Sequence, residues 1–550
     1  MGKQNHNIPA PAPDKSGLNR REMISQGSSM LGGFLLYPAV TAGEGRFSDE
    51  NENAVFNVRK FGASGNREEN ATAQIKAAVE ACAANGGGTV YVPPGDYTTG
   101  TIKLLDNVIL HVEAGATLYL SQSREDFIPG SRTMILGENA RNISVTGKGT
   151  LDGLAKYEFV DMRGLDPEIA EEIEIARKAG IDMRRYYRTG MQTFMFIFNN
   201  CTNILLRDIT VINSPLWNVR FNDCDRVYVR GVYIYSDLEK GVNADGIDIV
   251  SSRNVTISDS VIITADDAIV IKTIPRNDRP ANPAENITVT NCILSSSSTA
   301  LMIGTETHAD VKGVNFSHCV IRNSNKGFGI NVQDGAVVSD VIISHLTIET
   351  GRRHWNWWGS AEMCKFVLKK RSPESKLGVI RNIMIDHIIA HCRGTSTIHG
   401  LAEQPLENIR MNDIQVFMEP EDAKDKRATH ALEINRVRGI VIRDMSVNWI
   451  EEYAEPLWKS ALVLNDVNEF ELRSITGRQG LRNSDAPAIL LNEVSDGIIY
   501  DSRAASGCAA FIHVQGENCR DIVFRNNNLA RSSKGVTYAN EGLKNRVKEN

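Results

Sequence analysis

Short segments of alternating apolar and polar residues recur along the chain. Each opens with a small or polar residue, alternates apolar positions, passes a polar pair and returns to apolar positions, as in "NILLRDITV" and "NVTISDSVI". Alternation of this kind, enriched in Val, Ile and Thr, predicts short β-strands. The segments begin at Asn203, Arg226, Asn254, Asn286, Gly313, Asp340, Asn382, Asn408, Gly439, Glu469, Gly497 and Asp521.

The spacing of these segments predicts a solenoid. Successive segments start between 23 and 42 residues apart, a period that fits neither a β-hairpin nor a βαβ unit. A unit repeated with variable insertions cannot bury its apolar face alone, so neighbouring units stack. We therefore expect an all-β fold, a parallel β-helix whose coils stack at the strand spacing of ~4.8 Å around one core.

Helical and aromatic segments interrupt this pattern. Residues 69–87 combine helical spacing of apolar residues with a glycine stop, which predicts a helix that caps the first coil. Residues 160–190 predict a helical insertion between coils, and residues 351–375 contain an aromatic loop. We expect a single β-helix domain over residues 46–540.

The first 45 residues have the order of parts of a signal peptide. Arg20 and Arg21 precede a short apolar stretch from Leu31 to Val40, which leads into the small-residue site "VTA". The arginine pair resembles a twin-arginine export signal, so we expect export to the periplasm or the extracellular space. The alternative is a flexible tail with a chance hydrophobic patch. No apolar run approaches the ~18 residues that a membrane span requires.

Charge and cysteine content narrow the class of protein. The formal net charge of -6 lacks the basic footprint expected of a nucleic-acid binder. The nine cysteines include no CxxC pair, and several stand in or beside strand-like segments. We expect buried, unpaired packing residues, with one or two disulfides as the alternative in an oxidising compartment.

Three aspartates form two clusters that match the coil length. Asp245 stands in "NADGID", and Asp266 with Asp267 follows in "TADDA" after 21 intervening residues. We expect the clusters at equivalent places on adjacent coils, where like charges raise at least one pKa and keep a proton available. Glycoside hydrolysis requires one protonated and one ionised carboxyl group. The alternative is that these acids line solvated turns.

Several motifs occur in the order known from one enzyme family. They are "NADGIDI", "ADDAIVIKT", "NPAENITVTNC" and "MIGTE", preceded by "FNVRKFGASG", "GGGTVYVPPGDY" and "INSPLWNVRF". From about residue 55 to 350 the chain resembles glycoside hydrolase family 28, the polygalacturonase family, whose patterns are NTDGID, GDDCIAIKS, PSENI and IGSE. The resemblance implies a right-handed parallel β-helix that hydrolyses glycosidic bonds with inversion.

The resemblance also implies roles for individual residues. Asp266 matches the acid that donates a proton, and Asp245 with Asp267 matches the pair that activates water. Asn243 matches the Asn of NTD, and Lys272 matches the Lys of IKS as a contact at the floor of the site. Inversion implies carboxyl groups separated by roughly 6.5–9.5 Å, which leaves room for the water.

The sequence departs from the family pattern at positions that bind the uronate. Ser298 stands where the family carries a histidine, and Gly329 and Asn331 stand at the cations of an RIK-type triplet. No cation is left at these two positions, and ordinary endo-polygalacturonase activity is not expected, because a carboxylate without a paired charge is poorly held. The compensating candidates are Glu306, His308, Lys312, Arg184 and Arg185.

The aromatic loop "GRRHWNWWGSAE" supplies further candidates. Arg352, Arg353 and Trp357 have the chemistry for sugar stacking and for recognition of hydroxyl or carboxylate groups. The alternative is that the tryptophans pack the loop onto the wall of the helix. A related loop occurs in exo-acting members of the family, which implies a blocked cleft and release from a chain end.

These observations support an exported, inverting glycoside hydrolase that acts on a pectin-like or other acidic polysaccharide, in exo mode. A lyase or epimerase on the same architecture is one alternative, and a non-catalytic carbohydrate-binding β-helix is another. No metal or other cofactor is predicted, although Asp266 and Asp267 could bind a calcium ion. A carbohydrate is the expected partner, and the sugar, the linkage and the oligomeric state stay open.

Overall fold

The computed structural model describes residues 54–156, 158–159, 167–181, 187–188, 192–241, 243–276, 279–353, 359–450, 452 and 454–549. The predicted export segment, residues 1–45, lies outside the described residues. Residues Asn53–Asn550 form one compact unit.

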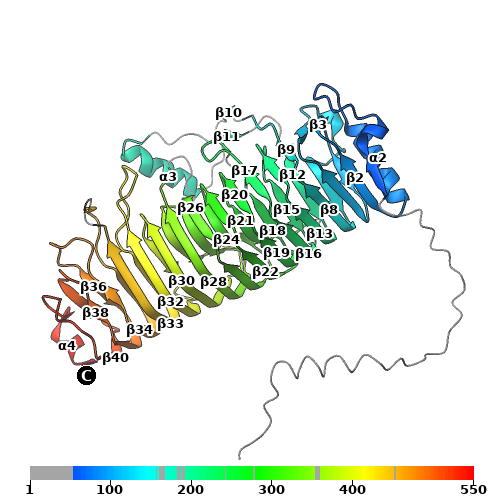
Figure 1. Ribbon diagram of the computed structural model, residues 1–550. Coiled ribbons are helices and arrows are strands. Elements are labelled where there is room, and N and C mark those ends of the chain that lie inside the picture. The colour runs from blue at the N-terminus through cyan, green and yellow to red at the C-terminus, as the bar shows by residue number, and fades with distance from the viewer. Residues whose placement is uncertain are drawn as a thin grey trace, which may run out of the picture. The chain divides into compact units, whose positions relative to one another are not determined.

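Parallel strands stacked side by side form a β-helix, as Figure 1 shows for strands from blue to red. The strands pair in three ladders, and one of them, here called the site face, carries the predicted acids. The site face contains β4 (Ile102–Leu104), β7 (Thr133–Glu138), β12 (Phe194–Asn199), β15 (Val219–Asn222), β18 (Ile247–Val250), β21 (Ile269–Thr273), β24 (Thr299–Thr307), β27 (Lys326–Val332), β29 (Glu362–Leu368), β31 (Ser396–His399), β36 (Pro487–Asn492), β39 (Ala510–Gln515) and β41 (Val536–Tyr538).

The other two ladders close each coil. The second contains β1 (Val55–Asn57), β2 (Gly88–Val92), β5 (Val108–Val112), β8 (Arg141–Gly147), β13 (Thr202–Arg207), β16 (Asp225–Arg230), β19 (Arg253–Ser258), β22 (Ala284–Thr290), β25 (Val311–Ser317), β37 (Ser495–Tyr500), β40 (Arg520–Arg525) and β42 (Val547–Glu549). The third contains β3 (Gly95–Thr99), β6 (Ala116–Leu120), β9 (Thr150–Asp152), β14 (Thr210–Ile212), β17 (Tyr233–Tyr235), β20 (Val261–Thr264), β23 (Ile293–Ser296), β26 (Val320–Ser324), β35 (Thr476–Gly477) and β38 (Arg503–Ala504).

Five long strands bend from one ladder into the next. β28 (Val337–Thr350), β30 (Val379–Cys392) and β32 (Leu406–Met418) run through the second and third ladders. β33 (Leu432–Trp449) runs through all three, and β34 (Leu462–Arg473) through the site face and the second ladder. The predicted all-β, right-handed parallel β-helix is confirmed.

The residues at which the repeated segments begin have a shared backbone geometry. Eleven of the twelve starts have a positive φ, for example 60° at Asn203 and 55° at Asn254, and the exception, Gly497, follows Asp496 at 55°. A sharp bend between ladders requires this left-handed conformation, which Asn, Asp and Gly adopt most readily. Asparagines at this bend also stack, since Asn203 Nδ2 donates to Asn142 Oδ1 at 2.9 Å.

The inward residues of the coils form one continuous core. Aromatic rings stack from coil to coil, with the ring centroids of Phe198 and Phe221 5.3 Å apart. All nine cysteines are free and buried, which confirms that they pack and do not form disulfides. The core is therefore held by burial of apolar surface and not by covalent links.

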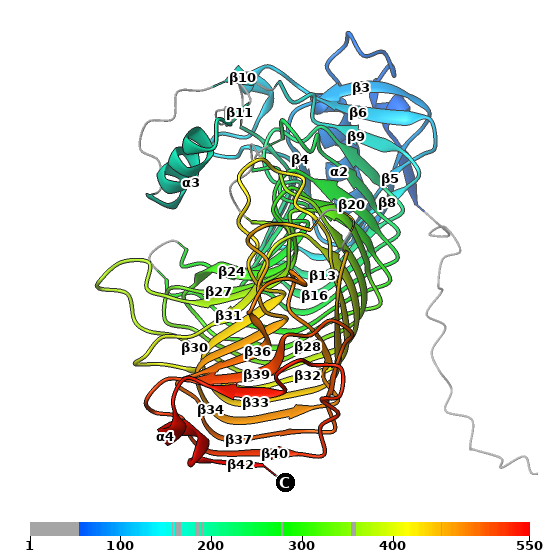
Figure 2. The same cartoon turned by 90° about the vertical axis from the view of Figure 1, so that its left-hand side faces the viewer.

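Helices lie at the ends of the stack and in one insertion (Figures 1 and 2). The predicted capping helix is confirmed as α2 (Thr72–Ala84), which buries Ile75, Ala78, Val79 and Cys82 against the first coil. The predicted insertion contains α3 (Pro167–Lys178) and the antiparallel pair β10 (Glu158–Phe159) and β11 (Tyr187–Arg188). Shorter helices are η2 (Val58–Phe61), η3 (Arg124–Asp126) and α4 (Glu541–Lys544). None of the described helices has the length and apolar character of a membrane span.

Candidate active site

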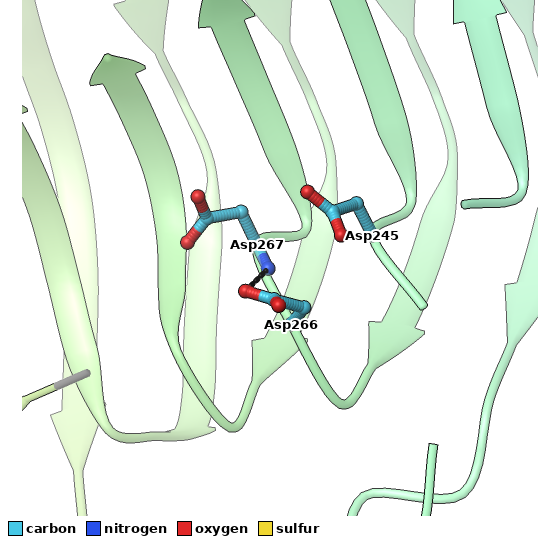
Figure 3. Close-up of side chains that lie close together, drawn as sticks. All are labelled: Asp245, Asp266 and Asp267. Carbon is cyan, nitrogen blue, oxygen red and sulfur yellow. Dashed lines mark hydrogen bonds between the residues drawn. The ribbon is translucent and has the colours of Figure 1, made fainter. Parts of the chain in front are cut away.

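The three predicted acids lie together on adjacent coils. Ile247 pairs with Ile269, which sets Asp245 and Asp267, each two residues earlier, beside one another. One carboxylate oxygen from each of Asp245, Asp266 and Asp267 lies within 4.8 Å of the others, and Figure 3 shows the three side chains gathered between neighbouring strands. The predicted registry is confirmed, although these oxygens are closer than the separation of roughly 6.5–9.5 Å that we expected for inversion.

The local backbone geometry favours two residues of the motif "NADG". Asn243 has a φ of 60°, a conformation that Asn tolerates well, and it turns the chain into the site. Gly246 stands where a Cβ atom would lie 2.3 Å from the carbonyl oxygen of Ala268. Its N–H donates to the carbonyl oxygen of Asp267 at 2.9 Å. The glycine therefore permits the close approach that brings Asp245 to Asp267.

Asp266 has the properties of a proton donor. Its side chain is 7% exposed, and Oδ1 accepts a hydrogen bond from the N–H of Asp267 at 2.9 Å (Figure 3). Burial, together with the charge of Asp267, raises the pKa of Asp266 to about 7. Asp266 can therefore hold a proton near neutral pH and release it to a leaving oxygen.

Asp267 is held in place by hydrogen bonds from the next coil. Its Oδ1 accepts hydrogen bonds from Ser298 Oγ at 2.8 Å and from the N–H of Thr299 at 3.0 Å. Two donors directed at one oxygen fix the orientation of the carboxyl group. Ser298, which stands at the position of the family's histidine, thus donates a hydrogen bond to Asp267 from the next coil.

Lys272 lies at the centre of the charged groups. Its Nζ atom is 3.4 Å from Asp245 Oδ2, 3.2 Å from Asp248 Oδ1 and 3.8 Å from Glu306 Oε2. The ammonium also lies 4.1 Å from the centroid of the Trp217 ring. Although burial disfavours its charge, Asp248 and Glu306 hold the pKa of Lys272 well above its ordinary value. Lys272 therefore supplies the charge that lets several carboxyl groups share one buried site.

Asp245 is more strongly perturbed than its neighbours. Burial raises the pKa of Asp245 well above its ordinary range, and the charges of Asp248 and Asp266 add to this effect. Lys272 opposes the shift. The protonation of one of these aspartates therefore affects the pKa of the others.

Sequence reasoning missed Asp248, Arg220 and Trp217. Burial raises the pKa of Asp248 to about 6, against the opposing charges of Lys272 and Arg220. Arg220 pairs in register with Asp248 from the preceding coil, and its guanidinium lies 4.9 Å from the centroid of the Trp217 ring. The available signal was strand alternation: Asp248 stands between the buried Ile247 and Ile249, so its side chain faces outward with that of Arg220.

A cation stands elsewhere on β27, outside the positions of Gly329 and Asn331. Lys326, at the start of this strand, is 7% exposed, and its Nζ atom donates to Thr299 Oγ1 at 3.4 Å. A Cβ atom on Gly329 would lie 3.4 Å from Lys326 Cδ. The stem of Lys326 therefore lies next to the position where the family carries its arginine. Burial lowers the pKa of Lys326, while the charges of Glu362 and Asp267 oppose that shift. A buried cation therefore lies close enough to the acids to interact with their charges.

Glu306 and His308 occupy different surroundings. Pairing between β21 and β24 shifts between Ile271 and Thr273, and the extra residues of β24 bring Glu306 to Lys272. Burial alone would raise the pKa of Glu306, but Lys272 holds it below its ordinary value. His308 Nε2 lies 3.7 Å from Asp334 Oδ2. The structure therefore brings Glu306 to the cluster and places His308 beside a separate carboxylate.

The arginines of the aromatic loop have partners within the protein. The Arg352 guanidinium is 8% exposed and donates to Asp425 Oδ2 at 2.9 Å. Arg353 Nη2 donates to the carbonyl oxygen of Asn323 at 3.0 Å. Arg352 thus anchors the base of the loop, because a buried and paired guanidinium is not available to a sugar. Trp357, Arg184 and Arg185 lie outside the described residues.

The acid cluster also has the donor set for a hard cation. Carboxylate oxygens within 4.8 Å of one another could ligate a calcium ion from one side. Lys272 already places a positive charge 3.4 Å from Asp245. The cluster therefore carries its own counter-charge, and the lysine competes with any ion at Asp245.

A right-handed parallel β-helix with three carboxyl groups gathered on one outer face defines the class of β-helical glycosyl hydrolases. Residues 82–352 match the family described as Glycosyl hydrolases family 28. The chain belongs to this family.

Known relatives agree with this assignment. The chain is 26% identical over 216 residues to a polygalacturonase of Malus domestica, a match that covers 39% of this chain and 43% of that protein. It is 23% identical over 299 residues to an exo-poly-α-D-galacturonosidase of Dickeya chrysanthemi, covering 47% and 49%. The chain thus spans about half the length of the curated relatives it matches.

A solved structure shows the same fold. A hyperthermoactive exopolygalacturonase from Thermotoga maritima superposes with a TM-score of 0.56 at 22% sequence identity, over 72% of this chain and 92% of that chain. Because the sequence identity is low, this likeness shows only that the two chains share the β-helix fold.

Proposed function

We propose that the protein is an exported glycoside hydrolase that releases acidic sugar units from the ends of pectin-type chains, with inversion of configuration. The observation that carries this proposal is the division of roles within one cluster. Asp266 has a pKa of about 7 and can protonate the leaving oxygen. Asp267 accepts two hydrogen bonds at one oxygen and stays available as the base.

Asp245 and Asp267 could share one attacking water, although the acid oxygens are closer together than the separation expected for inversion. Oxygens up to 4.8 Å apart can both accept from one water molecule at hydrogen-bond lengths of about 2.8 Å. Water held between Asp245 and Asp267 would lose a proton to the pair as it attacks the anomeric carbon, while Asp266 gives its proton to the departing sugar. One direct displacement of this kind inverts the anomeric centre.

The cations around the acids favour an anionic substrate. Arg220 is fixed by a hydrogen bond from Nε to Asn222 Oδ1 at 2.7 Å and by its stack on Trp217. Such a guanidinium is preorganised to bind a carboxylate through its terminal nitrogens. The names of the relatives from Dickeya chrysanthemi and Thermotoga maritima support exo action on galacturonan for this chain as well.

The test is hydrolysis of oligogalacturonides by the wild type and by Asp266→Asn. We expect the wild type to release monomer of inverted configuration, observed by NMR, and the variant to lose at least about 100-fold in kcat because the proton donor is gone. The Asn side chain keeps the size and the acceptor oxygen, so the fold should persist. Retained configuration, or full turnover by the variant, would contradict the mechanism.

A lyase is the second candidate, because the buried Lys326 has a lowered pKa, as a lysine base requires. A lyase would form an unsaturated sugar that absorbs in the ultraviolet, whereas a hydrolase would not. Absorbance during turnover therefore separates the two reactions.

Export is proposed from the sequence of residues 1–45. Replacing Arg20 and Arg21 by lysine should retain the precursor in the cytoplasm if the twin-arginine route is used. Fractionation of cells that express the two forms tests this, and unchanged export would exclude that route.

A further inference from the structure

A hollow lies along the site face on the C-terminal side of the acids. Its volume is about 260 Å³. It opens over β29, β31 and the segment that precedes β33. Its polar lining includes Glu362, Lys365, Thr395, Thr397, His399 and Arg427. None of these residues belongs to the acid cluster.

The strand register places the hollow in line with the acids. Thr299, which donates to Asp267, pairs with Lys326, and Lys326 pairs with Glu362. Glu362 therefore lies three coils beyond Asp267, a distance of roughly 14 Å at the strand spacing of ~4.8 Å. A short saccharide chain that lies along the face could reach both places at once.

The outward column that passes through Met302 and Gly329 carries no charge before it reaches Lys365. Met302 pairs with Gly329, and Gly329 pairs with Lys365, so the column runs from an apolar side chain through a glycine to a cation. Gly329 adds no side chain of its own here, and Met302 and the stem of Lys326 fill the space beside it. A sugar chain that passes along this column would thus meet no charge before Lys365.

The hollow offers cationic and neutral donors to an anion. Lys365 is exposed, and no ion pair links it to another of the residues that the structure describes. His399 Nε2 is buried without a hydrogen-bond partner among the described residues and lies 3.6 Å from Glu433 Oε1. Arg427, by contrast, is held by Asp425, to which its Nε donates at 2.9 Å. Lys365 is therefore the principal charge available to a ligand.

We propose that this hollow binds the carboxylate of a second acidic sugar unit, a few residues along the same polysaccharide chain from the bond that is cleaved. The inference rests on the proposed function, because it requires an acidic polysaccharide at the aspartates. It explains how a chain without the family's arginine and lysine at 329 and 331 can still hold a uronate polymer. The binding charge lies one coil beyond the usual strand.

Binding to a non-hydrolysing enzyme tests this proposal. Calorimetry would compare Asp266→Asn with the double variant Asp266→Asn, Lys365→Gln, using digalacturonate and hexagalacturonate as probes. We expect the double variant to bind the hexamer about tenfold more weakly, the size of one charge-assisted hydrogen bond, and to bind the dimer unchanged. Methyl esterification of the hexamer should remove the difference. Lys60→Gln in the same background, an exposed lysine on η2, is the matched control.

The outcomes separate this inference from the proposed function. Equal hexamer affinities for the double variant and its parent would overturn the hollow as a subsite while the hydrolase proposal stands. Failure of both galacturonates to bind the parent would overturn both proposals. Equal loss for dimer and hexamer would place Lys365 at the acids and overturn the distal subsite.

Discussion

The coils that carry the acids and the coils of β33 and β34 share one backbone plan but differ in their outward side chains. Both bury aliphatic residues inward, with Ile249 and Ile434 fully buried. On the outward face the first region buries Asp248 and Lys272. The second carries a ladder of amides instead, in which Asn465 Nδ2 donates to Asn435 Oδ1 at 3.3 Å.

This difference shows that inward side chains hold the coils together, whereas outward side chains can carry the chemistry. The inward column provides burial of apolar surface, which holds any coil in place. The outward column does not set the register, so charges can be introduced there without altering the coil. Burying those charges is unfavourable unless they are paired. We therefore expect the acid coils to be locally less stable than the amide coils and the protein to retain them for catalysis.

Lys272→Met should give the largest effect. The substitution removes the cation within 3.8 Å of three carboxyl groups while it preserves side-chain size. We expect a loss of ~3–5 kcal/mol in the free energy of unfolding, because buried charge is left uncompensated, together with loss of turnover. Urea unfolding at pH 7 and at pH 5 measures it. The loss should shrink at pH 5, and a loss that does not depend on pH would contradict the electrostatic cause.

Ile434→Ala and Ile249→Ala test whether the two regions share a core. Each removes a fully buried side chain at the same place in the coil, and we expect each to lose ~2–5 kcal/mol in stability. Only Ile249→Ala should also lower kcat, since Ile249 lies next to Asp248. Equal kcat losses in the two variants would show that the coils are not independent.

Asp266→Asn should stabilise the acid coils while it abolishes turnover. The folded pKa of Asp266, about 7, lies above its ordinary value of 3.8. The stability from the protonated form is therefore complete below about pH 4 and is lost as the pH rises through about 7. We expect the variant to exceed the wild type by ~1–3 kcal/mol at pH 8, with little difference at pH 4. Thermal unfolding across this range measures it, and a variant less stable at pH 8 would refute the assignment.

The same pKa sets the pH dependence of the wild type. Turnover requires the protonated Asp266, so kcat should fall about tenfold per pH unit above about 7. A rate that stays constant from pH 6 to pH 9 would show that another group donates the proton.

Ser298→Ala should give the smallest effect. It removes one of the two hydrogen bonds to Asp267 Oδ1 and leaves the N–H of Thr299 in place. We expect about a tenfold lower kcat and a loss of ~1 kcal/mol in stability. Ser344→Ala, a serine of β28 outside the acid cluster, is the control and should leave kcat unchanged.

The fold and the three acids could be predicted because both depend on short-range patterns. Residues at the starts of the repeats, such as Asn203 and Asn254, mark bends that require a positive φ. Alternation and period then set the ladders, and the match between the acid spacing and the coil length placed Asp245 beside Asp267. Arg220 and Trp217 stand in the motif "INSPLWNVRF" but escaped this reasoning, because the motif does not show which side chains they contact. Only the register of β15 against β18 brings Arg220 to Asp248.

The sequence by itself determined the coil, its caps and the row of acids, because a repeat with a period near one coil leaves its apolar pattern few other ways to be buried. The tertiary structure decided how charge is distributed around those acids. Lys326 donates to Thr299 of the preceding coil, and Arg352 donates to Asp425 of a separate loop. Such contacts depend on side-chain direction and burial, which strand periodicity does not specify.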